Sequence, residues 1–296
     1  MSERRHDPVL VSEIVEMLAP GQGGLFVDCT VGLGGHAQAL LDGGAARLLG
    51  LDRDPQALEI ASATLARFGV RVELVHADYR DLDRVLDERS IPGINGALAD
   101  LGVSSMQLDA EGRGFSFRRD EPLDMRMDRT RGDTAAELLR TAAEDEIANA
   151  IFQFGEERYS RRVARAIVNA RRERPIATTG ELATIVRRAV PHRGYQRIDP
   201  ATRTFQGLRI WVNRELDGLD GFLAAAAARL LRGARLAVIT FHSLEDRIVK
   251  HTFRALENTG ESLRVLTRRP LVPGDDEIDR NPRARSAKLR VIERFA

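Results

Sequence analysis

Four short apolar segments in the first hundred residues each end in an acidic residue. The segments cover residues 25–27, 47–51, 70–75 and 94–101, and the acids are Asp28, Asp52, Asp78 and Asp100. Helical sequence begins at residue 37 after the first segment and at Pro55 after the second. Such alternation, with short connections, predicts a parallel sheet covered by helices on both faces. Because ligands of these sheets bind at the carboxyl ends of the strands, we expect the four carboxylates to line one ligand site.

The strand signal stops after about residue 108. Residues 137–154, 158–172, 180–189 and 203–216 have helical periodicity, and no convincing strand lies between 109 and 200. Strand-like sequence returns at 236–240, 263–266 and 289–292, with a helix expected at 244–256. We therefore predict an α/β fold in which a helical domain, residues 109–202, interrupts a sheet domain formed by residues 1–108 and 203–296.

A glycine-rich segment, residues 28–36, follows the first predicted strand. Residues 32–37 fit the dinucleotide-binding pattern G-x-G-x-x-A, and Asp52 follows at a distance that suits a ribose. Two features favour S-adenosylmethionine instead. Asp28 stands where a dinucleotide site has its first glycine, and a pocket lined with acids attracts a sulfonium and repels a diphosphate. A helix cap or a turn explains any one of the acids, but all four at strand ends favour a methyltransferase over a dehydrogenase.

Longer segments make the chain resemble, over nearly its whole length, the bacterial 16S rRNA (cytosine-N4)-methyltransferase family. They are HDPVL (6–10), DCTVGLGGH (28–36), DRDP (52–55), DLGVSSMQLD (100–109), RGFSF (113–117), PLDMRMD (122–128), ATRTFQ (201–206), FHSLEDRIVK (241–250) and NPRARS (281–286).

This resemblance implies a class I, Rossmann-like S-adenosylmethionine methyltransferase sheet with an inserted all-helical domain that binds the substrate. It implies methylation of the exocyclic N4 of one cytidine in the decoding region of 16S rRNA, in the small ribosomal subunit. The implied cofactor-binding residues are Gly34, Gly35, His36, Asp52, Tyr79, Asp100 and Gln107. The family often has phenylalanine at the position of Tyr79.

Methylation of cytosine N4 requires activation of a weak nucleophile, because the N4 lone pair is conjugated into the ring. A positioned acceptor for the N4 hydrogens would aim this lone pair at the methyl group. Asp124, or backbone carbonyls near Ser104, are the candidate acceptors, with His242 close by. An ion pair of Asp124 with Arg126 or Arg129 is the alternative, as is a structural role for His242.

Aromatic and arginine residues mark the candidate RNA contacts. Phe115, Phe117, Arg118 and Arg119 form a loop suited to stacking on a flipped base. Arg126 and Arg209 are further candidate substrate contacts. Four arginines at 158–165 share one helical face, although a solvated face is the usual explanation of such a run.

The composition excludes several other classes of protein. The formal net charge is +1, so any affinity for RNA must be local, and Cys29 is the only cysteine, so we expect no disulfide partner. No cluster has metal-ligand spacing, and we expect no metal. Without a signal-like or membrane-spanning stretch, the expected location is cytoplasmic. Two alternatives stay open: a methyltransferase with another target, and a non-catalytic RNA-binding assembly factor.

Overall fold

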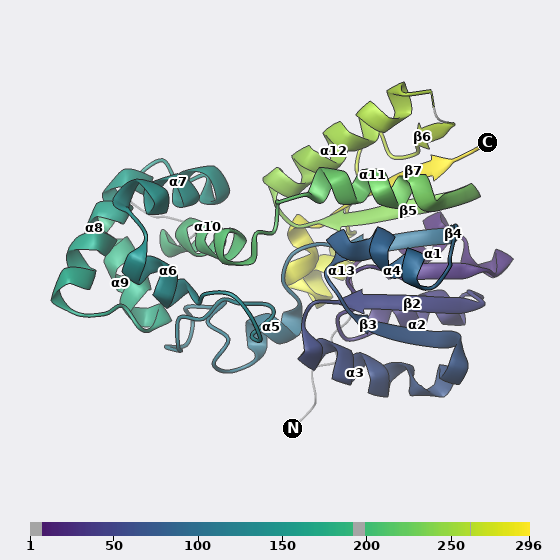
Figure 1. Cartoon of the computed structure of the whole chain (residues 1–296). Coiled ribbons are helices and arrows are strands. Elements are labelled where there is room, and N and C mark those ends of the chain that lie inside the picture. Colours follow the sequence, from purple (N-terminus) through teal and green to yellow (C-terminus); the bar gives the residue numbers. More distant parts are fainter. Residues whose placement is uncertain (1–7, 192–198, 261) are drawn as a thin grey trace. The chain divides into compact units, whose positions relative to one another are not determined.

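The computed structural model describes residues 8–191, 199–260 and 262–296, and it forms two compact units (Figure 1). The sheet unit contains the chain up to Gly102 and from Gly218 onward, and the helical unit is Val103–Asp217. The helical unit therefore begins at 103 rather than at the predicted 109, and it ends at 217 rather than at 202. The later end has a packing reason. Helix α10 (Ala201–Asn213) buries Phe205 and Leu208 in the core of the helical unit.

The sheet unit contains seven strands in the order β3-β2-β1-β4-β5-β7-β6. Strands β1 to β5 run parallel, and β7 is antiparallel to both β5 and β6. Their bounds are β1 Leu25–Asp28, β2 Arg47–Asp52, β3 Val72–His76, β4 Ile94–Asp100, β5 Leu230–Thr240, β6 Leu263–Val265 and β7 Lys288–Arg294. The parallel part has the 3-2-1-4-5 order of doubly wound folds. The structure thus confirms the predicted fold class.

Helices cover both faces of this sheet, because successive strand residues point to opposite sides. Phe26 and Leu48 pack in one apolar cluster, whereas Val27 and Leu49 pack in the other. The first cluster includes α1 (Val11–Leu18), α2 (Gly35–Asp42) and α3 (Pro55–Leu65). The second includes α4 (Leu82–Glu88), α11 (Leu219–Arg229) and α12 (Ser243–Asn258). A short α13 (Asp275–Arg280) precedes β7. Helices α1, α4 and α13 were not predicted from the sequence.

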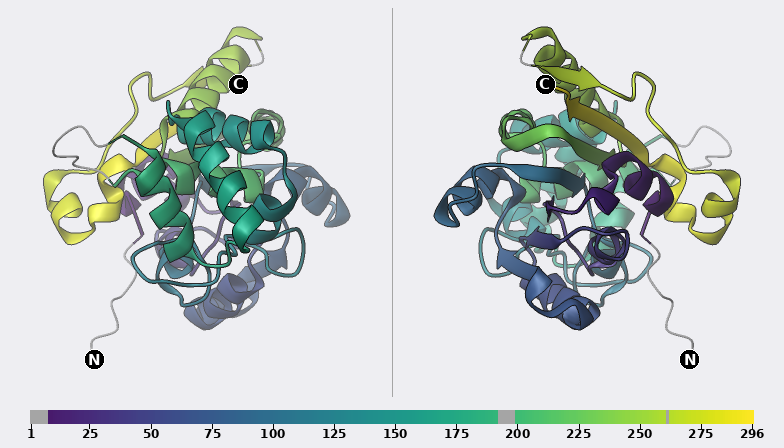
Figure 2. Two further views of the ribbon diagram at one scale, coloured as in Figure 1. Left: turned by 90° about the vertical axis from the view of Figure 1, so that its left-hand side faces the viewer. Right: turned by 90° about the vertical axis from the view of Figure 1, so that its right-hand side faces the viewer.

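The helical unit consists of short helices packed around one core, and its longer helices lie side by side (Figure 2). Besides α10 they are α5 Ser105–Asp109, α6 Ala135–Thr141, α7 Glu144–Gly155, α8 Ser160–Glu173 and α9 Thr179–Ala189. The single helix predicted at 137–154 is two helices, because the backbone is extended at Ala142 and Ala143. The Glu146 carboxylate accepts the Ala143 N–H at 2.8 Å, and this hydrogen bond begins α7.

Buried polar side chains fasten the loop between α5 and α6. The Arg113 side chain is 2% exposed and donates to the Met127 carbonyl at 2.9 Å. Asn213 accepts the Met127 N–H at 2.8 Å and donates to the Met125 carbonyl at 2.7 Å. Met125 has a φ of 65°, which a non-glycine residue seldom adopts. The shape of this loop therefore depends on side-chain clamps rather than on regular secondary structure.

Replacing Asn213 with alanine is expected to destabilise the helical unit by about 2–3 kcal/mol, because it leaves the buried Met125 carbonyl and Met127 N–H unsatisfied. Urea unfolding followed by Trp211 fluorescence reports on this unit, since the single tryptophan lies in α10. Asn169→Ala, at an exposed position of α8, is the control. Equal midpoints for the two variants would contradict the clamp.

Candidate functional site

Two carboxylates, the buried Asp28 and the half-buried Asp100, lie at the carboxyl ends of neighbouring strands. Asp28 ends β1 and Asp100 ends the neighbouring β4. Thr30 contacts both residues: its N–H donates to Asp28 Oδ1 at 3.2 Å, and its Oγ1 accepts the Asp100 N–H at 2.6 Å. Asp28 Oδ2 and Asp100 Oδ1 are buried and accept no hydrogen bond from the described residues. Two acceptors at this edge are therefore left for a ligand.

Burial makes both carboxylates hard to ionise and raises the pKa of Asp28 and of Asp100 to about 7. Only a protonated His36 would oppose this rise in the pKa of Asp28, whereas the charge of Glu245 adds to the rise in the pKa of Asp100. Buried charges normally have a partner. A cationic ligand would provide one, so this edge of the sheet is chemically suited to a sulfonium and an ammonium group.

Asp52, at the end of β2, holds the glycine loop. Its Oδ2 accepts the Gly32 N–H and its Oδ1 accepts the Asp54 N–H, both at 2.8 Å. Burial raises the pKa of Asp52, and these two hydrogen bonds lower it in part. Gly32 and Gly34 have φ values of 53° and 89°, a left-handed backbone that favours glycine. The hydrogen bond to the Gly32 N–H thus holds the glycine loop against Asp52.

Asp78 behaves differently from the other strand-end acids. Arg80 donates to both of its oxygens at 2.7 Å, and Arg53 approaches to 3.2 Å. Burial would raise the pKa of Asp78, but the hydrogen bonds from Arg80 lower it overall. Its Oδ1 also accepts the Arg80 N–H, so Asp78 caps the short 3-10 turn that follows. A cap with ion pairs therefore accounts for Asp78.

Tyr79 and His36 are both largely buried in the sheet unit. The Tyr79 ring packs against Phe222 of α11 with a centroid distance of 4.7 Å. His36 Nε2 donates to the Val9 carbonyl at 2.8 Å, so its Nδ1 is the unprotonated nitrogen of the neutral ring. Burial lowers the pKa of His36. Its Nδ1 lies 3.8 Å from Asp100 Oδ2. His36 is thus placed as a neutral neighbour of the acid pair.

The two candidate catalytic side chains both have local partners. Asp124, in the helical unit, pairs with Arg126 through contacts of 2.7 and 3.0 Å, and Arg129 lies 3.4 Å away. Burial raises the pKa of Asp124, but Arg126 lowers it overall, so the carboxylate is ionised. His242, in the sheet unit, caps α12 and lies 3.1 Å from Glu245 Oε1. The structure therefore contains both alternatives, an ion pair of Asp124 with Arg126 and a capping role for His242. Both catalytic roles stay predictions.

Gln107 belongs to the helical unit, where it is the third residue of α5. Its Oε1 accepts the Ser104 N–H at 3.0 Å, and its own N–H donates to Ser104 Oγ at 3.2 Å. This capping box fixes its side-chain oxygen. Gln107 was predicted to bind the cofactor on the resemblance alone. The S-x-x-Q spacing of residues 104–107 separately indicates the helix cap.

The predicted RNA contacts differ in accessibility. Phe115 is buried in the core of the helical unit, whereas Arg118 is exposed. Phe117 is half-buried, packs edge-on against Phe205 at 4.7 Å and lies under the Arg187 guanidinium at 5.5 Å. Of the predicted stacking pair, Phe117 is the more accessible ring.

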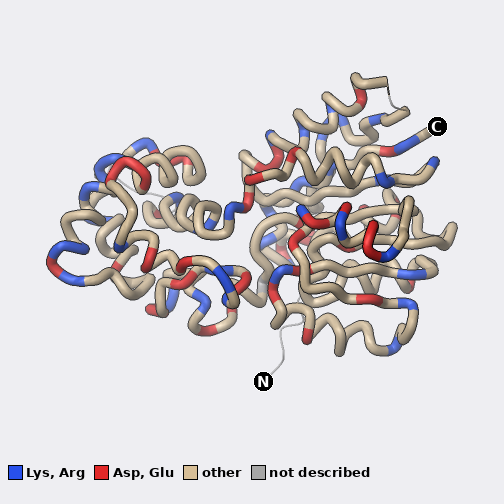
Figure 3. Tube along the Cα trace, viewed as in Figure 1, with Lys and Arg blue, Asp and Glu red and all other residues tan. Residues whose placement is uncertain are grey.

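Two of the predicted arginine contacts are held by carboxylates. Arg209 forms a bidentate pair with Glu215 at 2.9 and 2.8 Å, and both side chains are largely buried. Arg126 is held by Asp124. Either arginine would have to leave its carboxylate in order to bind a phosphate. On α8, Val163 and Ile167 are buried opposite exposed arginines, as the periodicity predicts. Acidic and basic residues alternate along the chain in both units (Figure 3).

Comparison with known proteins gives a match over almost the entire chain. The model of the MraW methylase family matches residues 3–295. A protein of Trichlorobacter lovleyi named ribosomal RNA small subunit methyltransferase H is 48% identical, with all of each chain covered. Proteins of the same name from Sorangium cellulosum and Nitrobacter winogradskyi are 50% and 51% identical, and in each case 98% of this chain and 91% of the relative are covered.

None of the helices in the described ranges combines the length and the apolar character needed to cross a lipid bilayer.

Affinity for S-adenosylmethionine is expected to fall as the pH drops from 8 to 6. Asp28 and Asp100, each with a pKa of about 7, are ionised above that pH and neutral below it, and only the ionised form attracts a cation. For each carboxylate that must be ionised, Kd rises about tenfold over this interval. Calorimetric titration at constant ionic strength measures the change. A Kd independent of pH would contradict it.

Asp100→Asn is expected to weaken cofactor binding and to make its pH dependence shallower, yet to raise Tm at pH 8. With its pKa raised, folded Asp100 binds protons more tightly than the unfolded chain, so its contribution to stability falls as the pH rises from about 4 to 7. The asparagine removes this penalty at pH 8, and at pH 4 the variant gains nothing. The exposed Asp279→Asn is the matched control. A variant with a lower Tm at pH 8 would show that Asp100 is instead stabilising.

Proposed function

The chain belongs to the MraW methylase family, and from this premise we propose that it methylates the exocyclic N4 of one cytidine in the decoding region of 16S rRNA. Small-subunit ribosomal RNA appears in the names of the relatives, and the resemblance of the sequence motifs supplies the N4 of cytidine. S-adenosylmethionine is the methyl donor. The observation that carries the proposal is the pair of strand-end carboxylates, Asp28 and Asp100, each with one buried oxygen that accepts no hydrogen bond from the described residues.

Residues of the sheet unit fit this cofactor. When bound, S-adenosylmethionine supplies an electrophilic methyl group on a positively charged sulfur. Asp28 and Asp100 would neutralise its cationic groups, with Gly34, Gly35 and neutral His36 forming the loop beside them. Asp52 would accept hydrogen bonds from the ribose hydroxyls while it holds the Gly32 N–H. Tyr79 is proposed to pack against the adenine, and Gln107 to add a polar contact from the helical unit.

When the cytosine N4 bonds to the methyl carbon, the bond between that carbon and the cofactor's sulfur would break, the sulfur would leave as a neutral thioether, and the amine would lose a proton. Asp124 is ionised and accepts well, and we propose that it orients the N4 hydrogens, or that backbone carbonyls near Ser104 do so. His242 is proposed to lie near the same amine. Water accepts the released proton. Because orientation rather than strong basicity is required, the ion pair with Arg126 is compatible with this role.

The helical unit is proposed to bind the RNA. Phe117 and Arg118 would hold the unstacked cytidine, since an accessible ring beside a cation suits a flipped base. The net charge of only +1 favours recognition of a folded ribosomal particle by its shape over general phosphate affinity. Such a particle is cytoplasmic, and so would be this protein.

Transfer of labelled methyl from S-adenosylmethionine to small subunits that lack the modification tests the function. We expect N4-methylcytidine at one 16S position, identified by mass spectrometry of the nucleosides. Label in another nucleoside would keep the methyltransferase and overturn the target. Cofactor binding without transfer to free rRNA, precursor particles or mature subunits would favour a non-catalytic assembly factor.

Asp124→Asn is expected to lower kcat by about a hundredfold, because the amide is a weaker acceptor and also carries donors. Asp128→Asn is the matched control, since Asp128 is a buried acid of the same loop that pairs with Arg131 at 2.7 Å. RNA binding and melting are measured for both variants. Full activity of Asp124→Asn with normal RNA binding would exclude the role, and equal losses in the two variants would assign Asp124 to loop structure.

A further inference from the structure

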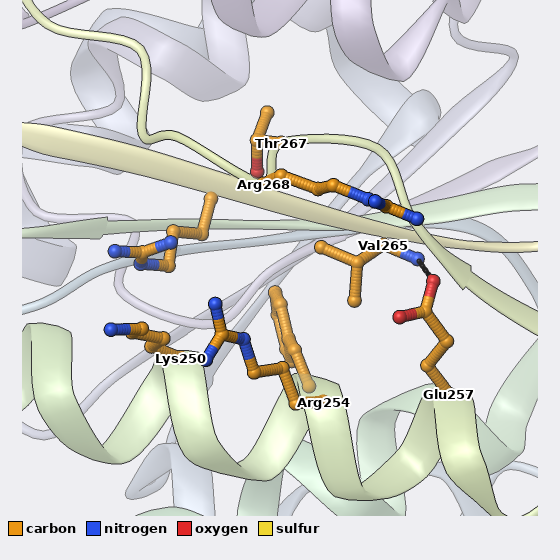
Figure 4. A pocket seen from close by; sticks show the side chains of 8 residues that line it. Lys250, Arg254, Glu257, Val265, Thr267 and Arg268 are labelled. Atoms are coloured by element: carbon orange, nitrogen blue, oxygen red, sulfur yellow. Dashed lines mark hydrogen bonds between the residues drawn. The ribbon is translucent and has the colours of Figure 1, made fainter.

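A basic pocket of about 170 Å³ lies between α12 and the strands β6 and β7 (Figure 4). It belongs entirely to the sheet unit. Its lining residues are Lys250, Phe253, Arg254, Glu257, Val265, Thr267, Arg268 and Arg290. Pockets for drug-sized ligands measure about 300–1,000 Å³, so this one suits a group no larger than a small anion.

Positive charge dominates the walls of this pocket. Lys250, Arg254 and Arg268 form no ion pair with a carboxylate in the described parts of the chain. Arg290 donates to Asp246 Oδ1 at 2.6 Å, and the same carboxylate accepts from Lys288 at 3.1 Å. The one acid of the lining, Glu257, accepts the Val265 N–H at 2.9 Å (Figure 4). Three cations from two different segments therefore line one small pocket together with a single carboxylate, that of Glu257, which forms an ion pair with none of them in the described residues.

The fold builds this arrangement from helical spacing. Lys250 and Arg254 are four residues apart and lie on one face of α12. In Figure 4 the Arg254 side chain rises from the helix on the side of Lys250, whereas the Arg268 side chain extends toward the end of the pocket formed by Val265 and Glu257. Phe253 is 1% exposed and forms the apolar floor. The Thr267 hydroxyl accepts the Val291 N–H at 2.8 Å, which fixes the rim. A lysine ammonium with arginine forks around a polar rim is the donor set that binds phosphate oxygens.

We propose that this pocket, the α12 phosphate pocket, binds a backbone phosphate of the RNA substrate. The proposal rests on the proposed function and gives the sheet unit its own contact with RNA. Arg254 and Arg268 are exposed at the rim, so the pocket is open to one phosphate of a long chain. Helix α12 starts directly after β5, at the strand edge that carries Asp100, and Lys250 lies about 10 Å along the helix from its first turn.

The double variant Lys250→Gln/Arg254→Gln tests the pocket. At about 0.15 M salt we expect its Kd for RNA, and its KM for unmethylated small subunits, to rise about tenfold. The slope of log Kd against log salt should fall by about 1, as for the loss of one phosphate contact. The Kd for S-adenosylmethionine, the kcat at saturating substrate and Tm should stay as in the wild type.

Arg47→Gln/Arg232→Gln is the matched control, because it removes two exposed charges from the amino ends of β2 and β5. Equal RNA affinity for wild type, control and pocket variant would overturn the proposal. A second result would also overturn it. If inorganic phosphate raised the Tm of the wild type but not of the pocket variant, and the RNA affinity of the two were equal, the ligand of the pocket would be a free anion. A single Arg268→Gln variant should weaken RNA binding in the same direction.

The proposal for the α12 phosphate pocket and the proposed function can each be overturned without the other. Weakened RNA binding in the pocket variant, with no N4-methylcytidine made by the wild type, would support the pocket and overturn the methylation target. N4-methylcytidine made with an unchanged KM by the pocket variant would support the target and overturn the pocket.

Discussion

The cost of burying one oxygen of Asp28 and one of Asp100 without a hydrogen-bond donor is the constraint from which the chemistry of the sheet unit follows. The parallel order of β1 and β4 forces these two strand ends together. Burial then raises the pKa of both carboxylates to about 7. A fold that only needed stability would place apolar groups there. This free-energy cost is explained if a cation binds beside the two carboxylates. The methyl donor carries a positively charged sulfonium, which ionised Asp28 and Asp100 would attract.

Much of this edge was predictable because it depends on local sequence. A short strand, an acid and a glycine loop have signatures within ten residues, and the sheet order follows from alternation of strand and helix. The different role of Asp78 could not be predicted from the sequence pattern. It has the same position in the pattern as Asp52, yet Arg80 and Arg53 neutralise it, and nothing in the pattern tells which acid finds an arginine.

The helical unit was harder to predict, because its decisive contacts join residues far apart in the chain. Asn213 fastens a loop more than eighty residues earlier, and no periodicity reveals that pairing. Arg209 looked available on a helix face, whereas Glu215 holds it in a bidentate pair. The end of the unit was misplaced because the amphipathic pattern of α10 does not tell which unit it joins, whereas its contacts with α7, α6 and α9 place it in the helical unit. Local capping signals are present at the first residues of α5, α6 and α9, but they indicate where helices begin rather than function.

The protonation state of Asp28 and Asp100 is the property that tests this account most directly. Carboxyl ¹³C NMR titration, assigned with Asp28→Asn and Asp100→Asn, would follow both groups in the free protein and with S-adenosylmethionine. The account predicts that both titrate near pH 7 when free and well below that pH when the cofactor is bound. Ordinary carboxyl pKa values in the free protein, or values that the cofactor leaves unchanged, would contradict it.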